Sequence, residues 1–311
     1  MNMLKQFKQA SRMHFLPMML ICIVLGALAA YLWDGEFHVL PFLITLIGSG
    51  AAHLFSTMYN DIVDYRSGVD PAAFASEESL STDSGYLTQG IWSLRQFAAV
   101  CWSMLGIAVL CCVYLAFYAG WWALGLGLIG VGLAYFYVGA PVRFGYWGRG
   151  TSEAAHVIAF GILPVMGAYY VQTSHFDSRL LLLSLPMGLL TTLTFFNHHF
   201  LHWRTDRQAG KYTLVVMWGE SKSFRLSPML LGLACLSIAL CVWQGILPIY
   251  AIAALAAAWP VWRMYGRMYG PMRLGRSLQT YQSLMGLSLD ATLRIGMIMI
   301  AAMGIQGLLL H

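Results

Sequence analysis

Apolar residues occur in long stretches separated by short polar segments. Nine stretches approach the roughly 20 mainly apolar residues that a helix needs to cross a bilayer. They lie near 16–32, 39–59, 97–117, 121–138, 154–171, 180–201, 228–243, 246–265 and 291–310. This pattern predicts an all-α polytopic membrane protein built as a bundle of nine transmembrane helices. The first stretch lacks a following small-residue cleavage site, so we expect an anchor helix rather than a removed signal peptide.

The composition excludes an ordinary soluble domain. Hydrophobic residues make up 59% of the 311 residues and charged residues only 10%. The six cysteines all fall inside the apolar stretches without metal-ligand spacing, which is typical of small core residues. We expect one transmembrane domain over residues 1–311, with polar loops at about 60–96, 139–153, 202–227 and 263–290. The loop after the second stretch is interpreted as either a functional lid or a disordered connector.

Positive charge is distributed unevenly between the two ends of the predicted helices. Almost all Lys and Arg residues precede the first stretch or follow an even-numbered one, namely Lys5, Lys8, Arg12, Arg66, Arg95, Arg143, Arg149, Arg204, Arg207, Lys211, Lys222, Arg225, Arg263, Arg267, Arg273 and Arg276. Only Arg179 falls on the opposite side. By the positive-inside rule, the N-terminus and these loops are cytoplasmic and the C-terminus lies outside.

The second stretch ends in a group of acidic and amide side chains. Asn60, Asp61 and Asp64 lie within about one helical turn, so their oxygens can converge. Such a group suits Mg²⁺, which is usually held by one or two carboxylates together with substrate phosphate oxygens. The alternative is a solvated helix end that carries acidic residues without a function.

The sixth stretch ends in a histidine cluster. His198, His202 and Asp206 recur every four residues, and His199 lies three residues before His202. Three histidines this close form a plausible metal-ligand set, although they could equally make an interfacial hydrogen-bonded cluster. Basic residues follow the cluster. Their cations could bind phosphate oxygens, or they could be the ordinary basic residues that flank a membrane span on its cytoplasmic side.

Motifs along nearly the whole chain resemble the UbiA superfamily of intramembrane prenyltransferases, most closely its 1,4-dihydroxy-2-naphthoate prenyltransferase branch. The resemblance rests on Asn60-Asp61-x-x-Asp64-Tyr65-x-Ser67-Gly68-Val69-Asp70, Gly148-x-Gly150 with Glu153, Gly167-x-Tyr169-Tyr170-Val171-Gln172-Thr173, and Asp206-Arg207-x-x-Gly210-Lys211-x-Thr213-Leu214. It implies a nine-helix bundle in which two Asp-rich helix ends bind Mg²⁺ and an isoprenyl diphosphate. It also implies a multi-pass protein of the bacterial inner membrane with its active site on the cytoplasmic side.

The resemblance assigns roles by position. The expected catalytic residues are Asp61, Asp64, His202 and Asp206; the expected metal ligands are Asp61, Asp64, Asp206, His198, His199 and His202; the expected substrate-binding residues are Asn60, Arg66, Arg143, Arg204 and Lys211. The chain departs from the family in the second Asp-rich motif. The family's other acidic position in that motif falls on His202 of this chain, and the family's paired asparagines fall on His198 and His199. The segment from Ser67 to Leu94 also has no Lys or Arg, and holds Glu77, Glu78 and Asp83 instead.

The leading hypothesis is a metal-dependent prenyltransferase that ionises an isoprenyl diphosphate and transfers the prenyl group to an aromatic or quinone-type acceptor. We expect Mg²⁺ as cofactor, with Mn²⁺ or another divalent metal as the alternative because of the histidines. The expected partners are the diphosphate, a hydrophobic acceptor and the lipid bilayer, and no nucleic acid. Three alternatives stay open at this point: a terpene cyclase, a transition-metal enzyme using the histidines, and a non-catalytic isoprenoid-binding relative.

Overall fold

Helices form nearly all the regular structure in the computed structural model, which describes residues 2–76, 79–269 and 276–310. Glu77, Glu78 and Arg273 lie outside the described residues. The long elements are α2 (Leu16–Asp34), α3 (Val39–Ser67), α5 (Leu94–Ala119), α6 (Trp121–Phe136), α8 (Leu163–Thr173), α9 (Arg179–His199), α13 (Leu226–Trp243), α14 (Trp259–Tyr269) and α15 (Leu278–Leu310). The short elements are α1 (Met3–Ala10), η1 (Met13–Phe15), α4 (Val69–Ala75), η2 (Phe144–Tyr146), α7 (Thr151–Val157), η3 (Ile158–Ile162), α10 (Trp203–Gln208), α11 (Leu214–Trp218), α12 (Glu220–Ser223) and η4 (Ile249–Ala258).

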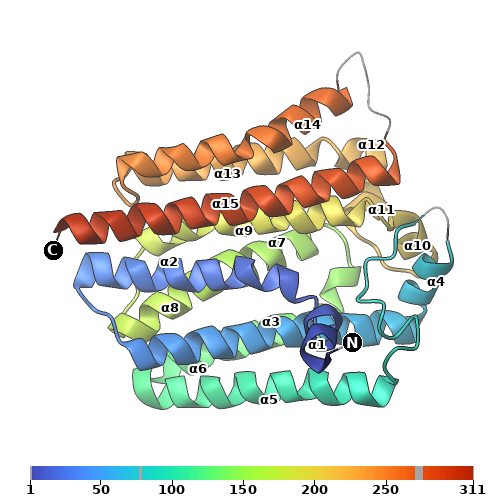
Figure 1. Cartoon of the computed structure of the whole chain (residues 1–311), viewed down its shortest axis with the longest axis horizontal. Coiled ribbons are helices and arrows are strands. Elements are labelled where there is room, and N and C mark those ends of the chain that lie inside the picture. Colours follow the sequence, from blue (N-terminus) through green and yellow to red (C-terminus); the bar gives the residue numbers. More distant parts are fainter. Residues whose placement is uncertain (1, 77–78, 270–275, 311) are drawn as a thin grey trace.

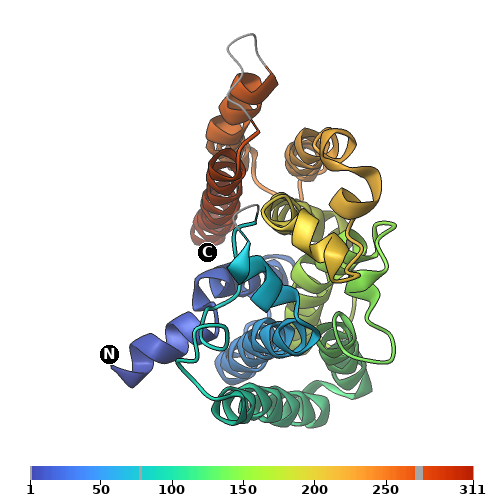
Figure 2. The same ribbon diagram turned by 90° about the vertical axis from the view of Figure 1, so that its right-hand side faces the viewer.

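The long helices run side by side as one bundle (Figure 1). Helix α3 packs along α5, α2 packs along α8, and α15 contacts both α2 and α9. The short helices α4, α10, α11 and α12 gather at one end of this bundle (Figure 1). Figure 2 looks along the helices from that end and shows α4 lying across the middle of the view. The bundle therefore has one end that is built largely from connecting segments.

Among the described residues, seven helices are long and apolar enough to cross a membrane. The predicted stretch at 121–138 corresponds to α6, whose 16 residues span only about 24 Å. The stretch at 246–265 is divided between η4, which is a 3₁₀-helix, and α14. Both segments are helical as predicted, but a 16-residue helix and a 3₁₀-helix fall outside the length and regularity of an ordinary spanning helix.

Several helices extend into segments that the sequence analysis assigned to loops. Helix α3 continues to Ser67, and α15 begins at Leu278 rather than near residue 291. In both cases polar residues continue the helix beyond the apolar stretch. The sequence analysis placed the boundaries too early or too late because hydropathy marks the membrane-spanning part of a helix and not its ends. Helix α3 ends at Gly68, whose φ of 82° is a left-handed conformation that glycine adopts without strain.

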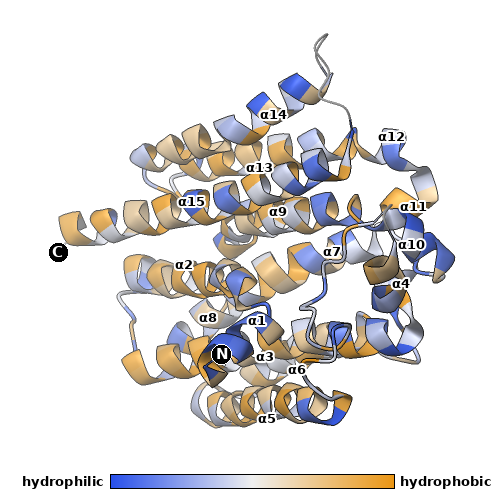
Figure 3. Ribbon diagram, turned by 45° about the vertical axis from the view of Figure 1, so that its right-hand side comes forward, coloured by the Kyte–Doolittle hydropathy of each residue, from blue (hydrophilic) through white to orange (hydrophobic). Residues whose placement is uncertain are grey.

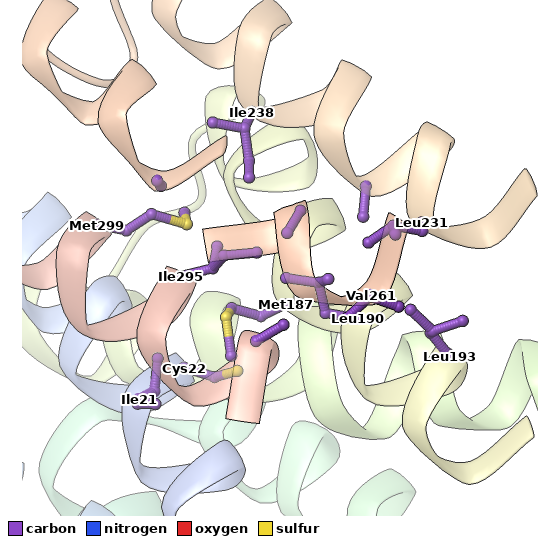
Figure 4. Packing of buried hydrophobic residues seen from close by; sticks show 14 of the residues in the cluster. Ile21, Cys22, Met187, Leu190, Leu193, Leu231, Ile238, Val261, Ile295 and Met299 are labelled. Atoms are coloured by element: carbon purple, nitrogen blue, oxygen red, sulfur yellow. The ribbon is translucent and has the colours of Figure 1, made fainter. Parts of the chain in front are cut away.

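The largest core cluster lies between α2, α9, α13, η4 and α15 (Figure 4). Leu190, Ile238 and Met299 are among its fully buried members. Small residues bring neighbouring helices close together: a Cβ at Gly26 would lie 2.2 Å from the carbonyl oxygen of Val165. Close backbone approach of this kind is the usual way in which membrane helices gain packing energy, since lipid offers no hydrophobic drive for association.

The outer surface of the bundle is apolar and its connecting end is polar (Figure 3). Phe117 is 88% exposed and Leu110 is 71% exposed, although both belong to a long apolar helix. Exposure of large apolar side chains on this scale is expected where lipid, and not water, surrounds a protein. The chain is thus an integral membrane protein whose charged side chains concentrate at the end that carries α4, α10 and α12.

Candidate active site

One cavity runs from the polar end of the bundle into its apolar interior. It has a volume of about 270 Å³ and is lined at its polar end by Asn60, Asp61, Asp64 and Lys211. Its deep wall includes Thr45, which precedes Asp64 on α3 by 19 residues, or about 28 Å of helix. A ligand that fills this space needs a charged end and a long apolar part.

The first acidic motif faces the cavity from the end of α3. Asp61 and Asp64 are both 2% exposed. Asn60 joins them through its amide, which donates a hydrogen bond of 3.3 Å to Asp64 Oδ2. The structure therefore brings together the three residues of the motif, as their helical spacing predicts.

Asp61 is paired with an arginine from the N-terminal segment. The guanidinium of Arg12 lies 2.7 Å from Asp61 Oδ1, and it also donates to the carbonyl oxygens of Thr57 and Thr82 at 3.1 Å. The second carboxylate oxygen of Asp61 accepts a hydrogen bond of 3.0 Å from the backbone N–H of Ser84. The sequence analysis missed this role because Arg12 precedes the first span, where the positive-inside rule already explains a basic residue.

Asp64 is paired with Lys211 from the other half of the chain. Lys211 Nζ lies 2.6 Å from Asp64 Oδ2, and the Tyr146 hydroxyl donates to Oδ1. A backbone bridge between Trp147 and Tyr212 holds the Tyr146 and Lys211 segments side by side. Burial alone would lower the pKa of Lys211, but Asp64 and Asp206 raise it well above its usual value. Lys211 is therefore a buried cation held by carboxylates.

The histidine cluster lines the same cavity. Helix α9 ends at His199 and α10 begins at Trp203, so a turn interrupts the helix that the four-residue spacing suggested. The side chains nevertheless form a chain: His202 Nε2 lies 3.2 Å from His198 Nδ1, and His202 Nδ1 lies 2.8 Å from Asp206 Oδ2. His199 lines the same cavity. Asn197, in contrast, is bonded to Ser288 in the core and takes no part in the site.

Asp206 keeps one oxygen without a partner. The residue is 0% exposed, and its Oδ1 has no hydrogen-bond partner among the described residues. Burial alone would raise the pKa of Asp206. The neighbouring His202 and Lys211 together lower it by more, so the pKa lies below its usual value. Asp206 is thus an anion with a free acceptor atom at the cavity wall.

Asp70 adds a further carboxylate from the start of α4. It follows the left-handed Gly68 by two residues and lines the cavity. Burial and the charges of Asp64 and Asp61 raise the pKa of Asp70 to about 9. The sequence motif from Asn60 to Asp70 includes this residue and could have indicated its role, but the sequence analysis did not name it as a site residue.

The segment after α4 covers the polar end of the cavity. Thr82 and Asp83 line it, and Leu80 N–H donates to the carbonyl oxygen of Leu201 at 2.9 Å. Ser84, as described above, donates to Asp61. In its described part this segment therefore meets both acidic motifs, which favours the lid interpretation over that of a connector.

Three expected substrate-binding residues lie outside the cavity lining. Arg66, Arg143 and Arg204 are exposed, and none of them belongs to the residues that form the cavity wall. Arg204 stacks on the Trp203 ring at 4.6 Å and reaches Glu220 at 4.0 Å. Their proposed contact with substrate stays a prediction.

The fold and the site together define a polytopic membrane protein with carboxylates and cations at the head of a long apolar cavity. The sequence profile of the UbiA prenyltransferase family matches residues 19–274. The chain belongs to this family of membrane prenyltransferases, as its motifs predicted.

Individual relatives agree with this assignment. The 1,4-dihydroxy-2-naphthoate octaprenyltransferase of Escherichia coli (strain K12) is 30% identical over 229 residues, which cover 72% of each chain. The enzyme with the same name from Bacillus subtilis (strain 168) is 24% identical over 218 residues, 70% of this chain and 67% of the relative. A UbiA homolog from Archaeoglobus fulgidus, solved bound to DMAPP and Mg²⁺, has the same fold with a TM-score of 0.59 at 14% identity, covering 93% of this chain and 98% of the homolog.

Proposed function

We propose that this chain transfers a prenyl group from an isoprenyl diphosphate to a naphthoate-type aromatic acceptor inside the membrane. The observation that carries the proposal is the division of the cavity, which has carboxylates and cations at its head and small apolar residues along its far wall. An isoprenyl diphosphate has the same division between a charged head and an apolar tail. The two naphthoate octaprenyltransferases named above support the class of acceptor.

The polar end of the cavity fits a divalent cation. Its described lining contains more carboxylates than cations, and Asp206 offers a buried oxygen without a partner. No three His, Cys, Asp or Glu side chains of the described residues are gathered into a complete ligand set. Mg²⁺ suits such a site, because it is usually held by one or two carboxylates and completed by phosphate oxygens of the substrate. The proposed ligands are Asp61, Asp64 and Asp206, with His198, His199 and His202 beside them.

Bound Mg²⁺ would neutralise the charge that develops on the diphosphate leaving group. Lys211 and Arg12 would contact its phosphate oxygens, since both cations line the head of the cavity. In doing so they would leave Asp64 and Asp61, which frees those carboxylates for the metal. Arg66, Arg143 and Arg204 would attract the diphosphate from solution, and Asn60 would orient it.

The reaction breaks the bond between the allylic carbon and the diphosphate oxygen, and the electron pair leaves with pyrophosphate. A ring carbon of the acceptor then forms a bond with the prenyl carbon, and the ring loses a proton. His202 is the proposed proton acceptor, since Asp206 lies 2.8 Å from its Nδ1 and fixes the orientation of the ring.

We also propose a membrane topology of nine spans with the N-terminus and the active site on the cytoplasmic side. The seven helices that can span a membrane, together with α6 and the η4–α14 segment, supply the nine. Helices α10 and α12, which carry Arg204, Arg207 and Lys222, lie at the same end of the bundle as α4 (Figure 3), and Arg12 pairs with Asp61 at the cavity head. This placement of basic residues agrees with the positive-inside rule. The two octaprenyltransferases named above come from bacteria, which supports a bacterial inner (plasma) membrane.

Pyrophosphate release by the detergent-purified protein tests the proposal. Geranyl, farnesyl and geranylgeranyl diphosphate are each supplied with Mg²⁺ or Mn²⁺, with and without 1,4-dihydroxy-2-naphthoate. Release that requires the acceptor supports prenyl transfer, whereas release without an acceptor indicates the terpene cyclase. Asp61→Asn should abolish release, and Asp290→Asn, at a residue 46% exposed on α15, is the matched control.

A further inference from the structure

His53 is a buried polar residue in the cavity wall that the diphosphate site does not use. It is 2% exposed, and neither ring nitrogen has a hydrogen-bond partner among the described residues. It lines the cavity directly. Buried polar groups in proteins nearly always have a hydrogen-bond partner, because leaving one unpaired costs its desolvation free energy. The imidazole therefore calls for a partner that occupies the cavity.

His53 lies deeper in the cavity than the acidic motif. It precedes Asn60 by seven residues, so it shares a face of α3 with the motif about 10 Å further in. The edge of its ring meets Phe160, with ring centroids 5.4 Å apart. Phe160 in turn packs on Phe195 at 5.5 Å, and Phe195 stacks on His156 at 4.7 Å. All of these rings line the same cavity.

The backbone around Phe160 is also irregular. Residues Ile158–Ile162 form a turn of π-helix between α7 and α8, and the thiol of Cys22 donates to the Phe160 carbonyl oxygen at 2.9 Å. Single π-helical turns inside α-helices occur frequently at functional sites, where they change the direction in which side chains point. The turn coincides with the residue that packs against His53.

We propose that His53, Phe160, Phe195 and His156 form the subsite for the aromatic acceptor, with the His53 imidazole hydrogen-bonded to a phenolic hydroxyl of that acceptor. This inference rests on the proposed function and names the substrate position within the same cavity. Aromatic side chains favour a flat aromatic ligand through stacked and edge-on contacts. A prenyl tail has no group that could pair with the imidazole, and it suits the small residues that also line the cavity, such as Gly130.

The hydroxyl is favoured over a carboxylate as the group that His53 binds. A neutral imidazole has one N–H donor and one acceptor nitrogen. A hydroxyl can donate to the acceptor nitrogen or accept from the N–H, so it can pair with either one. A carboxylate buried among Phe160 and Phe195 would need a cation, and the cations of the cavity lining, Arg12 and Lys211, pair with Asp61 and Asp64 at its polar end. The subsite therefore selects a hydroxylated ring.

Calorimetric binding of two probes to the detergent-purified full chain tests this subsite without requiring turnover. The probes are 1-hydroxy-2-naphthoate and 2-naphthoate, which differ only in the hydroxyl. The wild type should bind the hydroxylated probe about tenfold more tightly, a difference of about 1.4 kcal/mol. His53→Phe should remove that preference, His53→Gln should retain part of it, and His38→Phe, at a 46% exposed histidine beyond the other end of α3, should retain all of it.

Transfer kinetics separate this inference from the proposed function. In an active enzyme, His53→Phe should raise the KM for the naphthoate about tenfold and leave the KM for the prenyl diphosphate unchanged. Transfer with unchanged probe preference in His53→Phe would overturn the subsite, leave the function intact and indicate water as the partner of His53. Lost preference in a chain without transfer activity would support the subsite and contradict the function. If His53→Phe does not fold, His53→Leu against His53→Gln provides the same comparison.

Discussion

Lys211 Nζ lies 2.6 Å from Asp64 Oδ2, although 147 positions separate the two residues along the chain. This contact joins the end of α3 to the segment that follows α10, and it brings the two acidic motifs to one cavity. Both side chains are less than a tenth exposed. The ion pair therefore contributes to the fold in the absence of substrate and provides a cation for the diphosphate when substrate binds.

Lys211→Met should destabilise the protein by about 3 kcal/mol, because it leaves the buried carboxylate of Asp64 without its cation. The double variant Lys211→Met/Asp64→Asn should recover most of that stability while remaining inactive. Unfolding in detergent by denaturant measures both effects. Equal stability of wild type and Lys211→Met would show that the pair is not structural.

Asp70 should make the stability of the metal-free protein depend on pH. Its pKa is raised to about 9 in the folded state by burial and by Asp64 and Asp61, against about 3.9 in an unfolded chain. Between these values the folded protein holds a proton that the unfolded chain has released, so its stability falls as the pH rises. The wild type should lose more stability than Asp70→Asn between pH 6 and pH 9, as thermal unfolding will show. A parallel loss in both proteins would contradict this account.

Arg12 should hold the segment after α4 in place over the site. Its guanidinium connects Asp61 to the carbonyl oxygens of Thr57 and Thr82. Arg12→Gln should therefore raise the rate of amide hydrogen exchange over residues 80–88 several-fold. Without the arginine, local opening of the segment breaks fewer bonds and costs less free energy. Lys8→Gln, at an exposed residue of α1, is the control. Unchanged exchange in Arg12→Gln would mean that other contacts hold the segment.

Gly130 should limit the length of the prenyl tail. It lines the cavity, and a Cβ at this position would meet no atom within 4 Å. Gly130→Phe should therefore fold and occupy tail space, lowering kcat/KM for geranylgeranyl diphosphate relative to geranyl diphosphate about tenfold. Gly106→Phe, an equally open position on α5 outside the cavity lining, should leave the ratio unchanged. The same ratio in all three proteins would place the tail elsewhere.

Sequence reasoning predicted the helical bundle because membrane spans depend on local hydropathy. It also predicted the meeting of Asn60, Asp61 and Asp64, since neighbours on one helix face are set by helical geometry. The contacts of His202 with His198 and Asp206 formed as predicted even though the helix stops at His199. Side-chain reach bridged the turn.

The parts that were missed depend on contacts distant in sequence. Nothing local to Arg12 separates a flanking charge from a partner of Asp61, and the spacing of Tyr146 carries no sign of its contact with Asp64. The unpaired state of His53 appears only when the neighbouring helices are in place. Helix boundaries such as the start of α15 were missed because the end of an apolar stretch does not mark the end of the helix.

The most direct test of the central claim is the product mixture formed from geranylgeranyl diphosphate, 1,4-dihydroxy-2-naphthoate and Mg²⁺, measured by mass spectrometry together with pyrophosphate. The account predicts one prenylated naphthalene product for each pyrophosphate released by the wild type, and neither compound with Asp64→Asn. Pyrophosphate without a prenylated acceptor, or equal product from wild type and Asp64→Asn, would contradict it.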